Sequence, residues 1–261
     1  MSANRLWYVF GTLGLLSTIF FIVGFGLGVR DVLFPQANQT ELAAKPHSIE
    51  QPSGSSDGVF RIVAFGDSLT KGFGDETIKG YVGNVKEKLI KSTNKDVRVN
   101  NFAVNGYTSS KLLSDLMDHS GSLKAAEGAD VVMFTIGGND LYRQGKDKID
   151  PKLYAERSGK AKKQLQSIMK IFSENNPKSL IVYVGLYNPF VDKNEREAFD
   201  QAVTDWNADA AHYAATLPNV LVVNVADLFA RKTNSYLYID QYHPNALGYE
   251  RMATRVAQVL E

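Results

Sequence analysis

The feature that most constrains the fold is a regular alternation of apolar, strand-like runs with amphipathic segments, which begins at Val59. The strand-like runs are Phe60–Phe65, Val97–Val104, Val131–Ile136, Leu180–Leu186 and Val220–Val225. The segments between and after them have helical spacing: Tyr81–Lys91, Ser109–Met117, Leu153–Phe172, Lys193–Ala215 and Pro244–Leu260. Nearly unbroken apolar runs are typical of strands buried on both faces of a parallel sheet. The alternation therefore predicts an α/β domain, with a five-stranded parallel sheet covered by helices on both faces.

The composition is that of a globular protein and excludes several kinds of site. Of the 261 residues, 44% are hydrophobic and 22% are charged, and the net charge is +1. A chain so close to neutral has no electrostatic footprint for nucleic acid. The absence of cysteine excludes disulfides and a thiolate nucleophile. No cluster of His and acidic residues has metal-ligand spacing, so neither a metal nor a cofactor is predicted.

The N-terminus predicts a membrane anchor in residues 1–30. Trp7 to Val29 is a run of 23 residues without a charge. This run is longer than the about 20 residues that span a bilayer. A secretory signal has a shorter apolar core, of roughly 7–15 residues. The alternative is secretion after cleavage near Ala43-Ala44. Arg5 and the α-amino group precede the apolar run and place the short N-terminus in the cytoplasm, with the rest of the chain outside.

A flexible linker is predicted in residues 31–58. Gln36 to Gly58 is rich in Gln, Ser, Pro, Ala and Gly and offers little apolar surface to bury. The chain thus divides into an anchor, a linker and a folded domain over residues 59–261.

A serine stands where the first strand ends. Phe60–Phe65 is followed directly by Gly66-Asp67-Ser68-Leu69. Open α/β sheets bind their substrates at the carboxyl ends of the strands. Ser68 is therefore a candidate nucleophile, although a serine hydroxyl needs a base to take its proton.

His243 is the candidate base. It precedes Pro244, and proline favours the first position of a helix, so His243 is expected at a helix start. Asp240 lies three residues earlier, a spacing at which its carboxylate can reach the imidazole Nδ1 and leave Nε2 facing the serine. The alternatives are that His243 is a solvated cap and that Asp240 only caps the turn.

Gly106 and Asn139 are candidate donors to an oxyanion. Gly106 follows Asn105 after the second strand, and a glycine there lets a backbone N–H face the site. Asn139 follows Gly137-Gly138 after the third strand, and its amide is a neutral donor of suitable length. Both pairs are also ordinary turn signals. What favours a site is that all these motifs fall at carboxyl ends of strands or in the last loop.

On these motifs the chain resembles the GDSL, or SGNH, hydrolases. The resemblance rests on GDSL (Gly66 to Leu69), VNGYTS (Val104 to Ser109), GGND (Gly137 to Asp140) and DQYHPNALGY (Asp240 to Tyr249). It implies a flavodoxin-like three-layer α/β/α fold. It also implies that Ser68 is the nucleophile, with His243 and Asp240 completing the triad. The oxyanion hole would consist of the Ser68 N–H, the Gly106 N–H and the Asn139 side chain. The chain looks most like the membrane-tethered bacterial branch related to lysophospholipases and thioesterases.

The expected activity is hydrolysis of a small-molecule or lipid ester through an acyl-enzyme. Asp67 and Asp140 are expected to support the site by accepting hydrogen bonds from loop N–H groups. Segments that could line an acyl pocket are Tyr142, Tyr187 to Pro189, and Tyr236 to Tyr238. The alternative is that their aromatic side chains only pack against the rim. The alternatives are a carbohydrate O-acetylesterase that acts on cell-wall polysaccharide with the same machinery and a different pocket, and a binding module of this fold without activity.

Overall fold

The structure is a computed structural model that describes residues 14–18, 20–21, 24–25, 58–118, 121–142, 151–190, 193–230 and 233–260. The chain divides into two compact units, Met1–Pro46 and His47–Glu261. All the polar motifs of the sequence lie in the second unit.

A single parallel sheet forms the centre of the second unit, as predicted. Its strands are β1 (Val59–Gly66), β2 (Asp96–Asn101), β3 (Val131–Thr135), β4 (Leu180–Val184) and β5 (Val220–Val223). The spatial order is β2-β1-β3-β4-β5, and every neighbouring pair is parallel. The chain runs from β1 to one edge and then crosses over to β3. In a doubly wound sheet this reversal opens a crevice beyond the carboxyl ends of the two central strands, here β1 and β3.

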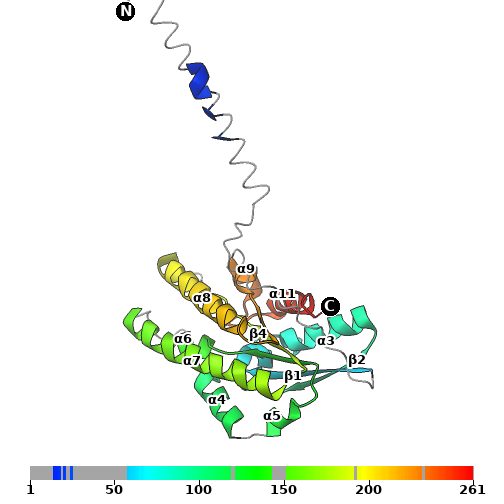
Figure 1. Cartoon of the computed structure of the whole chain (residues 1–261). Coiled ribbons are helices and arrows are strands. Elements are labelled where there is room, and N and C mark those ends of the chain that lie inside the picture. Colours follow the sequence, from blue (N-terminus) through cyan, green and yellow to red (C-terminus); the bar gives the residue numbers. More distant parts are fainter. Residues whose placement is uncertain are drawn as a thin grey trace, which may run out of the picture. The chain divides into compact units, whose positions relative to one another are not determined.

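Helices cover both faces of this sheet (Figure 1). The longer ones are α3 (Gly80–Thr93), α4 (Ser109–Met117), α7 (Pro151–Asn175), α8 (Lys193–Ala214) and α11 (Ala246–Ala257). The short ones are α2 (Ser68–Lys71), α5 (Gly121–Ala125), α6 (Gly138–Tyr142), α9 (Ala226–Ala230) and α10 (Thr233–Tyr236). The amphipathic segments thus predict the longer helices to within a few residues and miss the short ones.

The prediction that the last helix begins at Pro244 is wrong. The N-cap of α11 is Asn245, whose side-chain oxygen accepts a hydrogen bond from the Gly248 N–H at 3.0 Å. Pro244 instead pairs with Leu237 in an isolated antiparallel bridge. The asparagine side chain accepts a hydrogen bond from an N–H group of the first turn, which stabilises a helix start at this residue. Proline has no backbone N–H and supplies no such acceptor. His243 therefore lies in a loop before the helix and not at its first turn.

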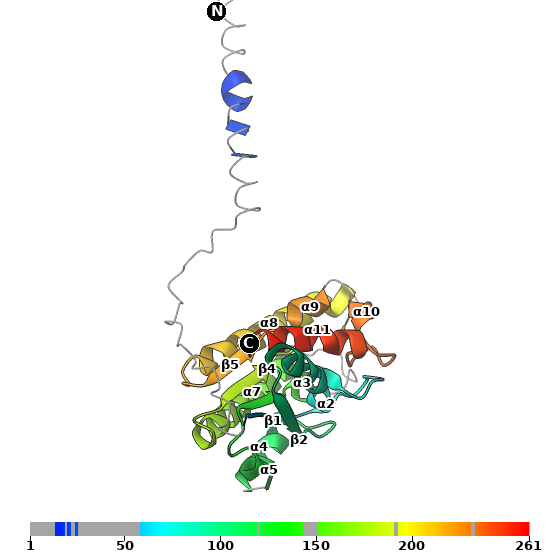
Figure 2. The same ribbon diagram turned by 90° about the vertical axis from the view of Figure 1, so that its right-hand side faces the viewer.

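Alternate residues of each central strand face opposite cores. Val63 and Phe65 pack with α4, α7 and α8, around buried side chains such as Phe172 and Trp206. Ile62 and Ala64 face the other way, toward α3 and α11. Figures 1 and 2 show α3 beside α11 on one side of the sheet, and α4 and α7 on the other. With both faces covered, only the strand ends and their loops are free to form a site.

The predicted anchor, Trp7 to Val29, lies largely outside the described residues, and the predicted linker lies almost wholly outside them. Residues 14–18, 20–21 and 24–25 are helical. Within the described part of the chain, no helix is both long enough and apolar enough to cross a bilayer.

Candidate active site

Ser68 begins α2 directly beyond the end of β1. Gly66 has a φ of 117°, and a β-carbon on it would lie 2.0 Å from the Thr135 carbonyl oxygen. Only glycine therefore lets β1 lie this close to β3 at its end. Asp67 is the N-cap of α2 and accepts a hydrogen bond from the Leu69 N–H at 3.0 Å. The cap places Ser68 in the first helical position, with only 7% of its surface exposed.

The structure brings His243 and Asp240 to this serine. His243 Nε2 lies 2.8 Å from Ser68 Oγ, and His243 Nδ1 lies 2.7 Å from Asp240 Oδ2. An ionised carboxylate can only accept, so Nδ1 carries the proton and Nε2 accepts from the serine hydroxyl. This is the tautomer that a base for Ser68 requires.

The loop that carries the imidazole is fixed by its own hydrogen bonds. Asp240 Oδ1 accepts from the backbone N–H groups of Tyr242 and His243, each at 3.0 Å. The Tyr238 N–H donates to the His243 carbonyl at 2.7 Å. Burial alone would raise the pKa of Asp240, but the hydrogen bonds from the His243 ring and from these N–H groups lower it below its usual value. Asp240 is therefore ionised at neutral pH.

The Asn105-Gly106 turn is held beside the end of β1. The Val104 N–H donates to the Gly66 carbonyl at 3.0 Å, which extends the β1–β2 pairing beyond the strands. The turn closes with the Tyr107 N–H donating to Val104 at 3.2 Å, and Gly106 has a φ of 78°. This positive φ favours glycine. Crowding is not the reason, because no atom lies within 4 Å of the position that a β-carbon would take.

Asn139 and Asp140 attach α6 to that turn and to the helix after it. Asn139 Nδ2 donates to the Tyr107 carbonyl at 2.8 Å. Asp140 accepts from the Ser109 N–H at 2.9 Å and from the Ser109 hydroxyl at 2.7 Å. Burial raises the pKa of Asp140, and the bonds from Ser109 partly oppose this. The supporting bonds expected of Asp67 and Asp140 are present.

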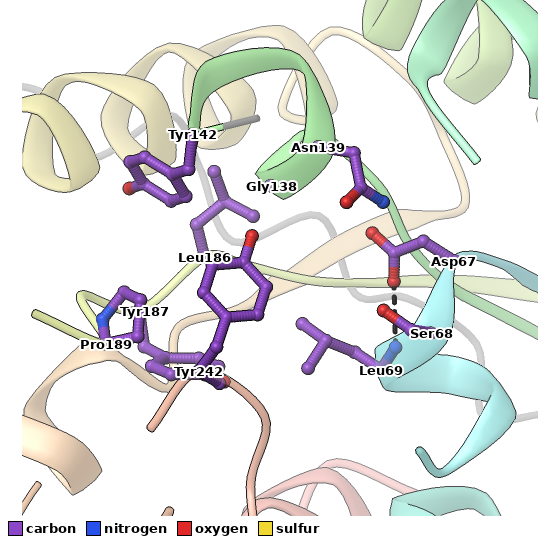
Figure 3. Close-up of a pocket in the computed structure, with 10 residues that line it drawn as sticks. All are labelled: Asp67, Ser68, Leu69, Gly138, Asn139, Tyr142, Leu186, Tyr187, Pro189 and Tyr242. Carbon is purple, nitrogen blue, oxygen red and sulfur yellow. Dashed lines mark hydrogen bonds between the residues drawn. The ribbon is translucent and has the colours of Figure 1, made fainter. Parts of the chain in front are cut away.

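Each of the three expected oxyanion donors has an N–H hydrogen that is not used on an acceptor among the described residues. Among the described residues, no acceptor is found for the backbone N–H of Ser68 or for that of Gly106. The first N–H groups of a helix have no partner within it, which accounts for Ser68. Asn139 uses one amide hydrogen on Tyr107 and has a second. Asn139 and Ser68 line the same pocket (Figure 3).

A buried chain of hydroxyl groups, which the sequence reasoning missed, ends at Asp67. Thr135 Oγ1 donates to Asp67 Oδ1 at 2.7 Å and lies 2.8 Å from Thr70 Oγ1, which in turn lies 2.8 Å from the Tyr81 phenol oxygen. The Thr135 hydroxyl has one proton and donates it to the carboxylate. Thr70 therefore donates to Thr135, and Tyr81 donates to Thr70. The Thr70 N–H also donates to Thr135 Oγ1, at 3.1 Å. The one sign of this hydroxyl chain in the sequence is Thr135, a hydroxyl residue within the apolar run that forms β3.

Asp67 is buried, with 2% of its surface exposed. Burial raises its pKa, while the Thr135 hydroxyl and the Leu69 N–H act in the opposite direction. The carboxylate thus holds both the first turn of α2 and the end of β3.

An apolar pocket extends from Ser68 (Figure 3). Tyr142, Tyr187 and Pro189 line it, as the sequence suggests, whereas Tyr236 to Tyr238 do not. The sequence reasoning missed the remaining apolar lining residues: Leu69, Leu186 and Tyr242. Within the described part of the chain, no group of three or more His, Asp or Glu side chains could hold a metal ion.

Comparison with known proteins identifies the family. Residues 64–251 match the model of the GDSL-like Lipase/Acylhydrolase family. The chain belongs to this family. It is accordingly a carboxylic ester hydrolase on the α/β fold of the SGNH enzymes.

Two Bacillus proteins are similar to this family member over most of their length. The protein YpmR of Bacillus subtilis is 37% identical over 207 residues, which cover 77% of this chain and 81% of YpmR. The spore germination lipase LipC of Bacillus licheniformis is 29% identical over 202 residues, which cover 74% of this chain and 92% of LipC.

Solved structures show the same architecture. The lipase Lip_vut3 from a goat rumen metagenome superposes with a TM-score of 0.67 at 27% identity, covering 76% of this chain and 96% of that chain. The acetylxylan esterase Axe2 of Geobacillus stearothermophilus shares the fold, with a TM-score of 0.59 at 20% identity over 77% of this chain and 94% of its own.

The first prediction concerns the buried hydroxyl chain. Thr135→Val keeps the side-chain volume but removes one of the two donors to Asp67 Oδ1 and leaves two donors of Thr70 without their acceptor. We expect the free energy of unfolding to fall by about 3 kcal/mol. The loss of a donor raises the pKa of the buried Asp67 further, and a raised acid pKa removes stability as the pH rises through it. The loss should therefore be larger at about pH 8 than at about pH 5.

Urea unfolding at both pH values measures this, and Thr135→Ser is the matched control. The serine variant keeps the hydroxyl and should lose only about 1 kcal/mol, for the missing methyl group, at either pH. Identical pH dependence in the two variants would contradict the assigned chain.

Proposed function

We propose that Ser68, His243 and Asp240 carry out ester hydrolysis through an acyl-enzyme. The observation that supports this most directly is the continuous contact from Asp240 through the His243 imidazole to Ser68 Oγ, with distances of 2.7 and 2.8 Å. The Ser68 hydroxyl thus donates to an imidazole whose other nitrogen donates to a carboxylate, although Ser68 and His243 lie far apart in the sequence. This order of donors and acceptors activates a serine.

In the acylation step, Ser68 Oγ attacks the ester carbonyl carbon while its proton passes to His243 Nε2. The carbonyl oxygen becomes an oxyanion, which would accept from the Ser68 N–H, the Gly106 N–H and Asn139 Nδ2. As the intermediate collapses, the bond to the leaving oxygen breaks and the proton on Nε2 moves to that oxygen. Asp240 remains ionised and stabilises the imidazolium throughout.

In the deacylation step, a water molecule replaces the alcohol. His243 Nε2 takes a proton from the water as its oxygen attacks the acyl carbon. The second tetrahedral intermediate then releases the carboxylic acid, and the proton returns to Ser68 Oγ. The cycle consumes one ester and one water and requires no cofactor.

The two alternatives differ from this proposal in different ways. A carbohydrate O-acetylesterase would use the same machinery with another leaving group: acetate released from acetylated peptidoglycan would assign it, and fatty acid released from a lysophospholipid would assign a lipase. A binding module without activity would have no need of an oriented base. The formed contact between the imidazole and the hydroxyl favours an enzyme over such a module.

The membrane-tethered branch of the family is part of the same proposal. The uncharged run from Trp7 to Val29 supports a single-pass anchor, and the flanking Arg5 supports an extracytoplasmic catalytic domain.

The nucleophile is tested by Ser68→Ala. With the attacking oxygen removed, kcat on p-nitrophenyl butyrate should fall at least about 10⁴-fold, while the thermal unfolding transition is retained. Labelling by a fluorophosphonate probe should disappear as well. Ser110→Ala changes an exposed serine of α4 and serves as the matched control. Undiminished turnover in the Ser68 variant rejects the mechanism.

The oxyanion hole is tested by Asn139→Ala. A donor that acts on the transition state should cost roughly 10²–10³ in kcat, with little change in KM. Asn105→Ala, in the exposed turn beside Gly106, is the control and should keep kcat near the parental value. A defect confined to KM would argue against the role given to Asn139.

The anchor is tested by fractionation of the full chain in a bacterial host. The parent should sediment with membranes and resist alkaline carbonate. Leu15→Arg combined with Phe21→Arg should release it, because each charge at the centre of a span costs about 2.5–3.5 kcal/mol. Ser110→Arg adds charge to the folded domain and should leave the fraction unchanged. A soluble parent chain shortened near Ala43 would instead support the cleaved signal.

A further inference from the structure

We infer that Tyr242 sets the acyl-chain length of this enzyme by closing the pocket a short distance from Ser68, so that the preferred substrates are esters of short acyl groups such as acetyl and propionyl. This deepens the proposed function and rests on it.

The acyl group is the part of the substrate that enters the pocket. At the tetrahedral carbon, one substituent is Ser68 Oγ and another is the oxyanion, which faces the donors from Ser68, Gly106 and Asn139. The leaving oxygen must face His243 Nε2 to receive its proton. The remaining substituent is the acyl chain, and the apolar pocket next to Ser68 is the surface left to receive it.

Tyr242 stands across this pocket (Figure 3). Its ring centroid lies 5.0 Å from that of His243 on the catalytic side and 6.4 Å from that of Phe190 on the other side. The phenol oxygen reaches the opposite wall, because a β-carbon on Gly138 would lie 3.4 Å from it. The side chain thus extends from the His243 loop to the start of α6, between Ser68 and the far wall of the pocket.

The far wall, which Tyr142 and Tyr187 line, is apolar and is supported by aromatic residues behind it. Phe190 contacts Tyr142 at a centroid distance of 5.5 Å and stacks on Phe199 at 4.1 Å. Tyr187 stacks on Phe229 at 4.1 Å. The methylene groups of a longer chain would be buried against this wall if Tyr242 did not stand before it.

The main chain of Tyr242 is held at both of its polar groups. Its N–H donates to Asp240 Oδ1 at 3.0 Å, and its carbonyl accepts from the Tyr187 hydroxyl at 2.6 Å. The ring is also confined between His243 and Phe190. A long acyl chain would have to displace this ring, whereas an acetyl group need not.

The test measures kcat/KM of the full-length, detergent-solubilised protein on p-nitrophenyl acetate, butyrate and octanoate. The parent should prefer acetate over octanoate by about 10-fold or more. Tyr242→Phe keeps the ring and should keep this order. Tyr242→Ala removes the barrier and should raise the octanoate-to-acetate ratio by about 10-fold or more.

The matched control is Tyr238→Ala, in the same loop but outside the pocket lining, which should leave the ratio unchanged. If the alanine variant does not fold, Tyr242→Leu replaces it, because leucine is shorter than tyrosine but keeps an apolar side chain beside Phe190. It too should raise the octanoate-to-acetate ratio. A parent that prefers octanoate, or a ratio that neither variant shifts, overturns the inference. A parent that hydrolyses none of the esters and is not labelled by a fluorophosphonate refutes the proposed function instead.

Discussion

The close approach of β1 and β3 at their carboxyl ends is the constraint on which the rest of the site depends. At Gly66 the chain passes so near the Thr135 carbonyl that a side chain has no room. The Asp67 N–H donates to that carbonyl at 3.2 Å, and the Asp67 carboxylate accepts from the Thr135 hydroxyl at 2.7 Å. The turn that presents Ser68 is therefore fixed to the strand that leads to Asn139. A doubly wound sheet places its crevice between these two strands, so the proposed nucleophile and one proposed oxyanion donor start from neighbouring positions.

Three carboxylates surround the site, and their environments give them different tasks. Asp240 accepts three hydrogen bonds from the His243 loop, which lower its pKa and keep a charge available for an imidazolium. Burial raises the pKa of Asp67 and of Asp140, and each holds a loop through neutral donors. The hydrogen bonds of Asp67 and Asp140 position the loops of the site, whereas Asp240 is placed to stabilise an imidazolium electrostatically.

The sequence predicts the parts of this fold that depend on long-range burial and misses those that depend on local hydrogen bonds. The five strands are visible because strands buried on both faces read as apolar runs. The short helices α2, α5, α6, α9 and α10 have too few residues for a helical period to appear. Pro244 misleads because the Asn245 cap determines where α11 begins. Thr135 stands in an apolar strand, and the pattern of that strand does not show that its hydroxyl joins Asp67 to Thr70. The expected pocket residues lie at strand ends or just before Asp240, whereas Tyr242 follows Asp240 in the chain.

The loop between α10 and α11 combines two proposed functions. It carries Asp240 and His243 and, between them in the chain, the aromatic side chain that lines the pocket. The hydrogen bonds that orient the imidazole also fix the main chain of Tyr242, because Asp240 Oδ1 accepts from both residues at 3.0 Å. The position of the base and the length of the pocket are consequently set by one carboxylate. A substitution that alters the substrate range by moving the backbone of this loop would therefore also move the imidazole of His243. A substitution that changes only the ring of Tyr242 leaves those backbone hydrogen bonds in place.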